Sequence, residues 1–295
     1  MATPSQWVHG ARPRTLPAAV APVLVGTSAA VLDGRWHLGL ALLALAVALA
    51  LQVGVNYANV YADGIRGTDE VRHGPVRLVG QRLAEPAAVK RAAFAAFGVA
   101  GVAGLALVAL AGHWWLLALG ALSVLAAWRY TGGESPYGYR GLGEVYVFVF
   151  FGLVATLGTE YTQASRISLF GVFGAIAIGS LASAILVANN LRDIPTDTVA
   201  GKRTLAVRLG DRRTRLLYAV LLGIPFVALA GMAWVSTPWA LLGLAAVVPA
   251  WGLVRIVRSG SSGPGLIPVL AGTGVTEIGY AALVTLGVAV AALQR

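Results

Sequence analysis

Long apolar runs without charged side chains alternate with short charged segments along this chain of 295 residues. A helix of about 20 apolar residues crosses the hydrocarbon core of a bilayer, with a range of roughly 17–25. Two runs are long enough for two crossings each, and turn-forming residues divide them near Gly112 and near Pro238. The runs, in chain order, are Leu16–Leu32, Trp36–Ala62, Ala92–Trp128, the segment between Glu144 and Glu160, Ile167–Leu191, Leu216–Val254 and Leu266–Leu293. This pattern predicts an all-α bundle of nine transmembrane helices.

Charged segments divide the predicted bundle into two similar halves. Acidic residues gather at one end of the second and of the sixth predicted helix, four helices apart. This spacing indicates two four-helix halves followed by a ninth helix. We expect a single membrane domain over residues 1–295, with large loops at about 63–91 and 192–215.

Basic residues predict the orientation of the bundle, because Lys and Arg concentrate in cytoplasmic loops. If the N-terminus is cytoplasmic, 19 of the 22 Lys and Arg residues fall on that side, and only Arg35, Arg166 and Arg295 fall outside. The sequence therefore predicts a multi-pass protein of the cell (inner or plasma) membrane. Its N-terminus lies inside, its C-terminus lies outside, and a site among the large loops faces the cytoplasm.

Composition agrees with a membrane protein. Hydrophobic residues make up 58% of the chain and charged residues 12%, with a mean hydropathy of +0.77. A soluble domain has about 45–50% apolar and about 25% charged residues. The net charge of +10 would suggest a nucleic-acid partner for a soluble chain, but in a membrane chain it indicates basic loops or an anionic substrate. The absence of cysteine excludes disulfides, thiolate metal sites and cysteine nucleophiles.

Two polar stripes mark the cytoplasmic ends of the predicted helices. Gln52, Asn56, Asn59 and Asp63 are spaced i, i+4, i+7 and i+11, which keeps them on one helix face. The second stripe contains Asn189, Asp193 and Asp197 at i, i+4 and i+8, and Pro195 is expected to bend or end its helix before Asp197.

The chemistry of these stripes has a structural and a catalytic interpretation. Asn side chains can join membrane helices and aspartates can simply mark the membrane surface. Two matching clusters favour Mg²⁺, which prefers one or two protein carboxylates together with phosphate oxygens and water. Basic residues beside both clusters would neutralise the phosphates of a diphosphate with a lipid tail. They are Arg66, Arg72, Arg77, Lys202 and Arg203.

Over nearly its whole length the sequence resembles the UbiA-type intramembrane prenyltransferases. Two segments, Pro136–Glu144 and Asn189–Asp193, are similar to the branch that prenylates 1,4-dihydroxy-2-naphthoate in menaquinone synthesis. Many family members have a second acid where this chain has Val60. The other matching segments are Ala11–Pro17, Asn59–Asp63, Gly67–Asp69, Gly74–Arg77, Asp193–Asp197, Gly201–Lys202 and Leu209–Gly210.

The resemblance implies a reaction. An all-trans polyprenyl group moves from polyprenyl diphosphate to the naphthoate with loss of diphosphate and CO₂, giving demethylmenaquinol, which is oxidised to demethylmenaquinone. Departure of the diphosphate leaves an allylic carbocation, which the apolar bundle shields from water. The resemblance also implies two Mg²⁺ ions, held by Asn59, Asp63, Asp193 and Asp197 with help from Asp69.

Further polar residues are candidates for substrate contacts. Tyr139 and Arg140 are expected to cap the site and contact the diphosphate or the naphthoate carboxylate, although interfacial tyrosines often only anchor a protein in the bilayer. Glu277, inside the ninth predicted helix, would orient an aromatic hydroxyl, pair with an arginine or serve a structural role. The predicted substrate-binding set is Asn56, Arg66, Arg77, Tyr130, Lys202, Arg203 and Glu277.

Three other functions share some of these features. A related prenyltransferase would use another aromatic acceptor, such as 4-hydroxybenzoate, and the aspartate clusters do not distinguish the two. A CDP-alcohol phosphotransferase also uses intramembrane aspartates and Mg²⁺, but gathers its aspartates in one motif. A transporter would place its polar site near the bilayer midplane, whereas these carboxylates are expected at the inner surface.

Overall fold

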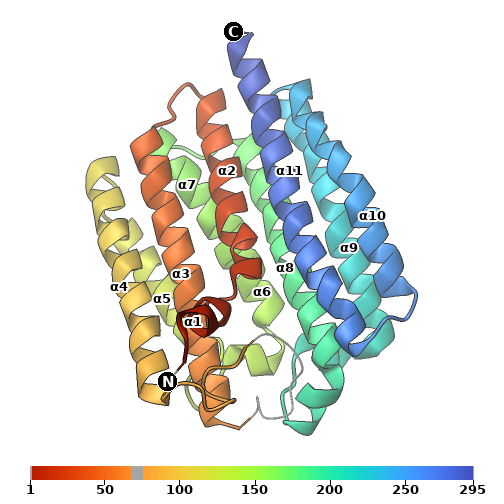
Figure 1. Ribbon diagram of the computed structural model, residues 1–295. Helices are drawn as coiled ribbons and strands as arrows, with labels where there is room; N and C mark the ends of the chain where they lie inside the picture. The colour runs from red at the N-terminus through yellow and green to blue at the C-terminus, as the bar shows by residue number, and fades with distance from the viewer. Residues whose placement is uncertain (1, 68–75, 295) are drawn as a thin grey trace.

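The computed structural model describes residues 2–67 and 76–294, and every regular element in those ranges is a helix. The all-α prediction is confirmed. The longer helices run roughly alongside one another, and the two chain ends lie at opposite ends of the bundle (Figure 1). The helices are α1 (Pro4–Gly10), α2 (Pro17–Leu32), α3 (Leu38–Ile65), α4 (Pro86–Ala111), α5 (Leu116–Arg129), α6 (Gly143–Val147), α7 (Ala155–Ala164), α8 (Leu169–Val199), α9 (Leu205–Val235), α10 (Val247–Arg258) and α11 (Ile267–Leu293). A π-helical segment, Phe148–Val154, joins α6 to α7.

Helix ends follow the predicted turns. Gly112 ends α4 in the left-handed conformation, with φ of 77°, where glycine carries no Cβ penalty. Its backbone N–H donates to the carbonyl of Val108. α9 ends at Val235, and Thr237 caps the next helical segment by accepting a hydrogen bond from the N–H of Trp239. Both double-length runs are therefore divided at the expected positions.

The expected end of the helix at Pro195 is wrong, because α8 continues through it to Val199, and a bend there stays a prediction. Proline removes one backbone hydrogen bond, here the bond that residue 195 would donate to the Leu191 carbonyl, and two threonine hydroxyls add bonds to the carbonyls that follow it. The hydroxyl of Thr196 donates to the Asp193 carbonyl at 3.0 Å, and that of Thr198 donates to the Ile194 carbonyl at 2.7 Å. Most of residues 192–215 is consequently helical, and the connection between α8 and α9 is only residues 200–204.

Several helices have the dimensions of membrane spans. In the described ranges, seven helices are long and apolar enough to cross a bilayer, or up to eight if the bent pair formed by Pro4–Thr15 and Pro17–Leu32 counts as one span. α5 is apolar but shorter, with 14 residues.

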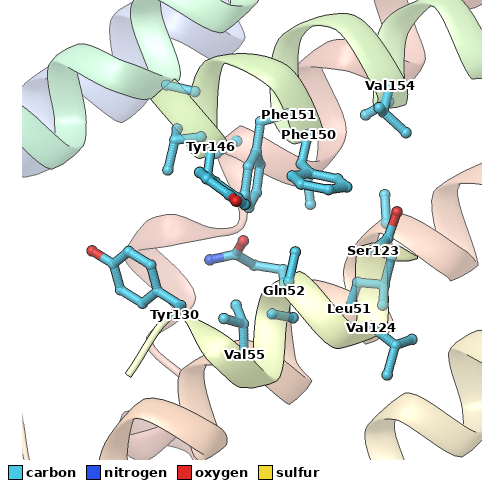
Figure 2. A pocket seen from close by; sticks show the side chains of 18 of the residues that line it. Leu51, Gln52, Val55, Ser123, Val124, Tyr130, Tyr146, Phe150, Phe151 and Val154 are labelled. Carbon is cyan, nitrogen blue, oxygen red and sulfur yellow. The ribbon is translucent and has the colours of Figure 1, made fainter. Parts of the chain in front are cut away.

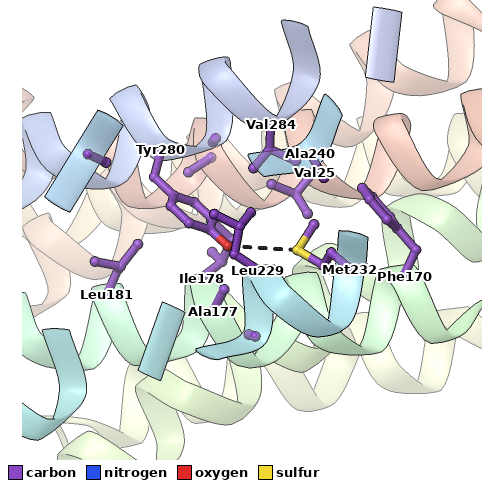
Figure 3. Packing of buried hydrophobic residues seen from close by; sticks show 14 of the residues in the cluster. Val25, Phe170, Ala177, Ile178, Leu181, Leu229, Met232, Ala240, Tyr280 and Val284 are labelled. Carbon is purple, nitrogen blue, oxygen red and sulfur yellow. Dashed lines mark hydrogen bonds between the residues drawn. The ribbon is translucent and has the colours of Figure 1, made fainter. Parts of the chain in front are cut away.

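A compact apolar core joins α2, α8, α9 and α11. Ile178 and Leu229 are fully buried there, and the Tyr280 ring inserts between the helices with its hydroxyl near the sulfur of Met232, at 3.7 Å (Figure 3). The same hydroxyl donates to the carbonyl of Pro225 at 3.1 Å, so the buried phenol is satisfied. This core joins α2, from the first half of the bundle, to α8, α9 and the last helix.

Candidate active site

A cavity of about 550 Å³ lies between α2, α3, α4, α5, the α6–α7 helix and α8. Tyr146, Phe150 and Val154 form one wall, opposite Leu51 and Val124 from α3 and α5 (Figure 2). Most of the lining is apolar, and its charged side chains come from the helix ends and connecting segments. The predicted site residues that line the cavity are Asn56, Asn59, Asp63, Arg77, Tyr130, Tyr139, Asp197 and Lys202.

Asp63 connects the two predicted clusters. Its Oδ1 accepts hydrogen bonds from the Tyr139 hydroxyl at 2.5 Å and from the Lys202 ammonium at 3.0 Å. The ammonium also lies over the Tyr139 ring, 4.3 Å from its centre. The backbone N–H of Arg203 donates to the Tyr139 carbonyl at 2.9 Å, which ties the 200–204 connection to the turn at 137–140. Three segments that are distant in sequence thus meet at one buried carboxylate.

Asn59 and Arg66 organise the turn that follows α5. The Thr131 hydroxyl donates to Oδ1 of Asn59 at 2.8 Å. The Arg66 guanidinium donates to the carbonyls of Thr131 and Gly133 and lies 5.3 Å from the Tyr139 ring centre. Arg66 does not line the cavity. Sequence analysis did not single out Thr131, since a lone threonine after a helix has no distinguishing pattern.

The second stripe separates into two environments. Asp197 is 1% exposed and lines the cavity, as Asn189 and Asn190 do. Asp193 does not line it, and both its carboxylate oxygens accept bonds from the buried Arg192 guanidinium, at 2.7 and 2.8 Å. The same guanidinium donates to Oδ1 of Asn189 at 2.8 Å. Asp193 therefore holds the Arg192 guanidinium, which in turn positions the cavity residue Asn189.

Replacing Asp193 by asparagine is expected to destabilise the protein by about 3–5 kcal/mol, because removing one partner leaves a buried charge uncompensated. The measurement is thermal unfolding in detergent. Asp211→Asn is the matched control, since the Asp211–Arg215 pair is largely exposed on its acidic side and contributes about 1 kcal/mol or less. Equal unfolding temperatures for Asp193→Asn and the unaltered protein, together with lost activity, would instead identify Asp193 as a direct ligand.

Gln52 and Asn56, the first two residues of the first stripe, bind the N-terminal segment. The Gln52 amide donates to the Thr15 hydroxyl at 2.8 Å, and the Asn56 amide donates to the Ala11 carbonyl at 2.8 Å and to the Thr15 hydroxyl at 3.0 Å. Arg12, within this segment, has the left-handed φ of 54° and lines the cavity. Left-handed backbone is uncommon for arginine, and such conformations cluster at functional sites. From the sequence, Arg12 counts as an orientation signal and as part of the Ala11–Pro17 segment of the resemblance, with no role in the site.

Residues spaced four apart along the α6–α7 helix line the cavity, and the first two of them are aromatic. Tyr146, Phe150, Val154 and Gly158 are four residues apart and all line it. In an α-helix of 3.6 residues per turn this spacing drifts by about 40° at each step. The π-helical segment Phe148–Val154 lies within this series, and the neighbouring residues Val147, Phe151, Ala155 and Thr159 line the cavity as well. The Tyr146 ring stacks on Tyr137 with centres 3.8 Å apart.

Tyr130 adds a phenol at the charged end of the cavity. Burial raises its pKa well above the ordinary value, and the nearby carboxyl groups of Glu144 and Asp63 act in the same direction. The phenol stays protonated over the ordinary pH range, so it remains a hydrogen-bond donor.

Besides Arg66 and Asp193, other predicted site residues lie away from the cavity lining or outside the described ranges. Arg140 and Arg203 are exposed and do not line the cavity. Glu277 is fully buried in α11, away from the cavity lining. Asp69 and Arg72 lie outside the described residues. The functional roles assigned to these residues stay predictions.

The oxygen-bearing side chains at the charged end of the cavity fit a Mg²⁺ ion that the substrate also ligates. Within residues 2–67 and 76–294, no three His, Cys, Asp or Glu side chains gather closely enough to hold a metal ion. Mg²⁺ usually takes one or two carboxylates and completes its shell with phosphates and water. Asp63 and Asp197 line one cavity, with Asn59 beside them, which is an oxygen donor set of that kind.

The family match and the most similar relatives point to the same kind of protein. The UbiA prenyltransferase family matches residues 19–266. The chain is 54% identical over 281 residues to the 1,4-dihydroxy-2-naphthoate octaprenyltransferase of Mycobacterium tuberculosis, covering 95% of this chain and 96% of that protein. It is 43% identical over 230 residues to the Escherichia coli protein of the same name, covering 76% and 75% of the two chains.

Solved structures show the same fold. A UbiA homolog from Archaeoglobus fulgidus bound to DMAPP and Mg²⁺ superposes with a TM-score of 0.68, covering 97% of this chain and 99% of that one, at 15% identity. The same homolog bound to GPP and Mg²⁺ gives a TM-score of 0.70, covering 96% and 99%, again at 15% identity.

Proposed function

The chain belongs to the UbiA prenyltransferase family, and we propose that it transfers an all-trans polyprenyl group from polyprenyl diphosphate to 1,4-dihydroxy-2-naphthoate. The observation that carries this proposal is the 54% identity, over 95% of the chain, to a 1,4-dihydroxy-2-naphthoate octaprenyltransferase. The product is a demethylmenaquinol, a precursor in menaquinone synthesis, which is then oxidised to the demethylmenaquinone.

The diphosphate binds at the charged end of the cavity. Asn59, Asp63 and Asp197 would hold two Mg²⁺ ions there with help from Asp69, whereas the pair with Arg192 gives Asp193 a positioning role. Bound Mg²⁺ neutralises charge on the departing diphosphate. Solved UbiA homologs bound to Mg²⁺ together with DMAPP or GPP support the binding of a prenyl diphosphate with Mg²⁺ by this fold.

Lys202 pairs with Asp63 in the structure and would bind the diphosphate during the reaction. In the structure its ammonium neutralises Asp63 at 3.0 Å, which keeps a buried carboxylate paired. When a diphosphate arrives, Lys202 turns from Asp63 to the phosphate oxygens, and Arg77 in the cavity wall joins it. Tyr139, which also bonds to Asp63, keeps that carboxylate oriented.

Prenyl transfer requires no added oxidant or base. The C–O bond of the allylic carbon breaks and its electron pair leaves with the diphosphate. The naphthoate ring carbon that bears the carboxylate bonds to the allylic carbon. The bond to the carboxylate then breaks, CO₂ departs, and that electron pair restores the aromatic ring. Tyr146 and Phe150 present aromatic faces to the cation and exclude water from it.

Arg12 is positioned to bind the acceptor carboxylate before transfer. Hydrogen bonds from α3 fix its segment, and its side chain lines the same cavity as the aromatic wall. A guanidinium binds a carboxylate in a two-point geometry, which would hold the carboxyl-bearing carbon in a defined place.

The chain is a multi-pass membrane protein. We place nine spans in it, with α5 and the bent α1–α2 pair each as one, the N-terminus in the cytoplasm and the C-terminus outside. The chain ends at opposite ends of the bundle support an odd number of spans (Figure 1). The 19 basic residues on one side support a charged end facing the cytoplasm from the plasma membrane. Residues 1–295 then form one domain around the cavity.

The test is acceptor choice. Purified protein receives all-trans octaprenyl diphosphate, Mg²⁺ and either 1,4-dihydroxy-2-naphthoate or 4-hydroxybenzoate. We expect prenylation of the naphthoate, at a kcat/KM about 100-fold or more above that for the single-ring acid, because a single ring makes less contact with the aromatic wall and is positioned less well. Prenylation of 4-hydroxybenzoate alone would refute the proposal.

A further inference from the structure

A second pocket, of about 650 Å³, lies between the beginning of α9 and the end of α10. None of its lining residues lines the active-site cavity. Figure 1 shows α9 and α10 side by side, on the side of the bundle away from α4. The pocket is therefore separate from the candidate active site. It is lined by Asp211, Arg212, Arg213, Arg215, Leu216, Arg258 and Gly260.

One arginine of this pocket joins the two helices. The Arg215 guanidinium donates to both carboxylate oxygens of Asp211, at 2.7 Å each. It also donates to the carbonyl of Val257, at the end of α10. The acidic side chain of the lining is thus already paired, and α9 is fastened to α10 beside the pocket.

The other arginines of the pocket are available to a ligand. Arg212, Arg213 and Arg258 are exposed, and within residues 2–67 and 76–294 their side chains make no hydrogen bond or ion pair. Positive charges that converge on one hollow attract an anion into it. A guanidinium binds phosphate oxygens through two parallel hydrogen bonds, so three of them favour a phosphate group.

Exposed apolar side chains continue from the pocket along both helices. On α9, Arg212, Leu216 and Val220 are spaced four apart along one face, and the two apolar residues are 62% and 50% exposed. On α10, Trp251 is 61% exposed and lies seven residues before Arg258, which places both on one face. The two residues are about 10 Å apart along the helix axis. Exposed tryptophan is typical of the bilayer interface, so the arginines lie at the level of lipid headgroups.

We propose that this pocket binds the phosphate headgroup of an anionic membrane phospholipid, whose acyl chains lie along the exposed apolar face of α9. Arg212, Arg213 and Arg258 bind the phosphate, and Arg215 keeps the two helices at the spacing that the headgroup requires. Basic pockets between membrane helices bind lipid headgroups in this way. The site does not depend on the proposed prenyl transfer, because it shares no lining residue with the cavity.

The experiment measures lipid binding to the purified protein in detergent, by mass spectrometry of the intact complex. Dioleoylphosphatidylglycerol is compared with dioleoylphosphatidylcholine, which has the same acyl chains but no net charge. The test variant carries Arg212→Gln and Arg258→Gln. The matched control carries Arg129→Gln and Arg255→Gln, because these arginines are also exposed, each in the last turn of its helix, but line neither the pocket nor the cavity.

We expect the unaltered protein to bind phosphatidylglycerol about tenfold or more tightly than phosphatidylcholine. The test variant should lose this affinity by about tenfold or more, whereas the control variant should keep it within about twofold. Equal losses in the two variants would show a general attraction between basic surface and anionic lipid, and would overturn the proposal. Equal affinity of the unaltered protein for the two lipids would overturn it as well.

A soluble competitor tests whether the acyl chains contribute. Glycerol 3-phosphate has a phosphate group of the same kind without the chains, and it is added at the concentration of the lipid. We expect phosphatidylglycerol to stay bound. Displacement by the soluble compound would identify a site for free phosphate compounds and refute the lipid assignment. Unfolding temperatures of both variants equal to that of the unaltered protein are expected, since every substituted side chain is exposed.

Discussion

Replacing Asp63 by asparagine is expected to lower kcat for prenyl transfer by about 10³-fold or more. Asp63 lies where the two polar clusters meet, and Tyr139 and Lys202 both donate to its Oδ1. Asparagine has the same shape and keeps an acceptor oxygen for both donors, but it lacks the negative charge that attracts Mg²⁺. Removing one preorganised electrostatic group at a site of developing charge typically costs about 10²–10³-fold, and loss of a metal ligand adds to it.

The control for this substitution is Asp33→Asn. Asp33 pairs with Arg166, whose side chain is 60% exposed, in a segment that does not line the cavity. This variant should retain kcat within about twofold. Unfolding temperatures of both variants show whether each is folded. If Asp63→Asn is folded and keeps more than about a tenth of kcat, Asp63 does not have the central role assigned to it.

Much of the architecture was predictable because the bilayer imposes simple requirements. Apolar run length predicted the helices, and Gly112 and Pro238 marked the divisions inside the double-length runs. Asp63 and Lys202, which belong to the two clusters predicted at corresponding helix ends, meet in the structure. When two helices of similar length cross the bilayer, residues at corresponding positions in the two apolar runs are expected at the same depth in the bundle.

Contacts that depend on a particular neighbour were not predictable. Gln52 and Asn56 have the spacing of a stripe that continues to Asp63, yet their amides bind the N-terminal segment and thereby position Arg12. Likewise Asp193 has the spacing of a cavity residue, but Arg192 takes up its carboxylate. Periodicity identifies a helix face, and only the packed structure shows which element covers each part of that face.

The helix irregularities also follow from tertiary packing. The α6–α7 helix contacts α8 so closely that a Cβ on Gly152 would lie 2.5 Å from the Cα of Gly179. The π-helical turn occurs at this contact and directs Phe150 and Phe151 into the cavity. Local propensity carries no signal for such a turn, so the aromatic wall was missed.

Removal of divalent metal is the second change with a very large expected effect. Asn59, Asp63 and Asp197 provide oxygen donors around one end of the cavity, and in the described structure His, Cys, Asp and Glu side chains alone do not make a closed metal site. Metal and diphosphate are therefore expected to bind together. Without metal the basic residues alone face the leaving group, and transfer should fall by about 10³-fold or more.

One assay tests this central claim most directly. Purified protein is incubated with octaprenyl diphosphate and carboxyl-labelled 1,4-dihydroxy-2-naphthoate, either in a chelator or with Mg²⁺ restored, and three products are counted. With Mg²⁺ we expect labelled CO₂, diphosphate and unlabelled prenylated ring in equal amounts, and in the chelator none above background. Prenylated product that keeps the label, or transfer that continues undiminished in the chelator, would contradict the account.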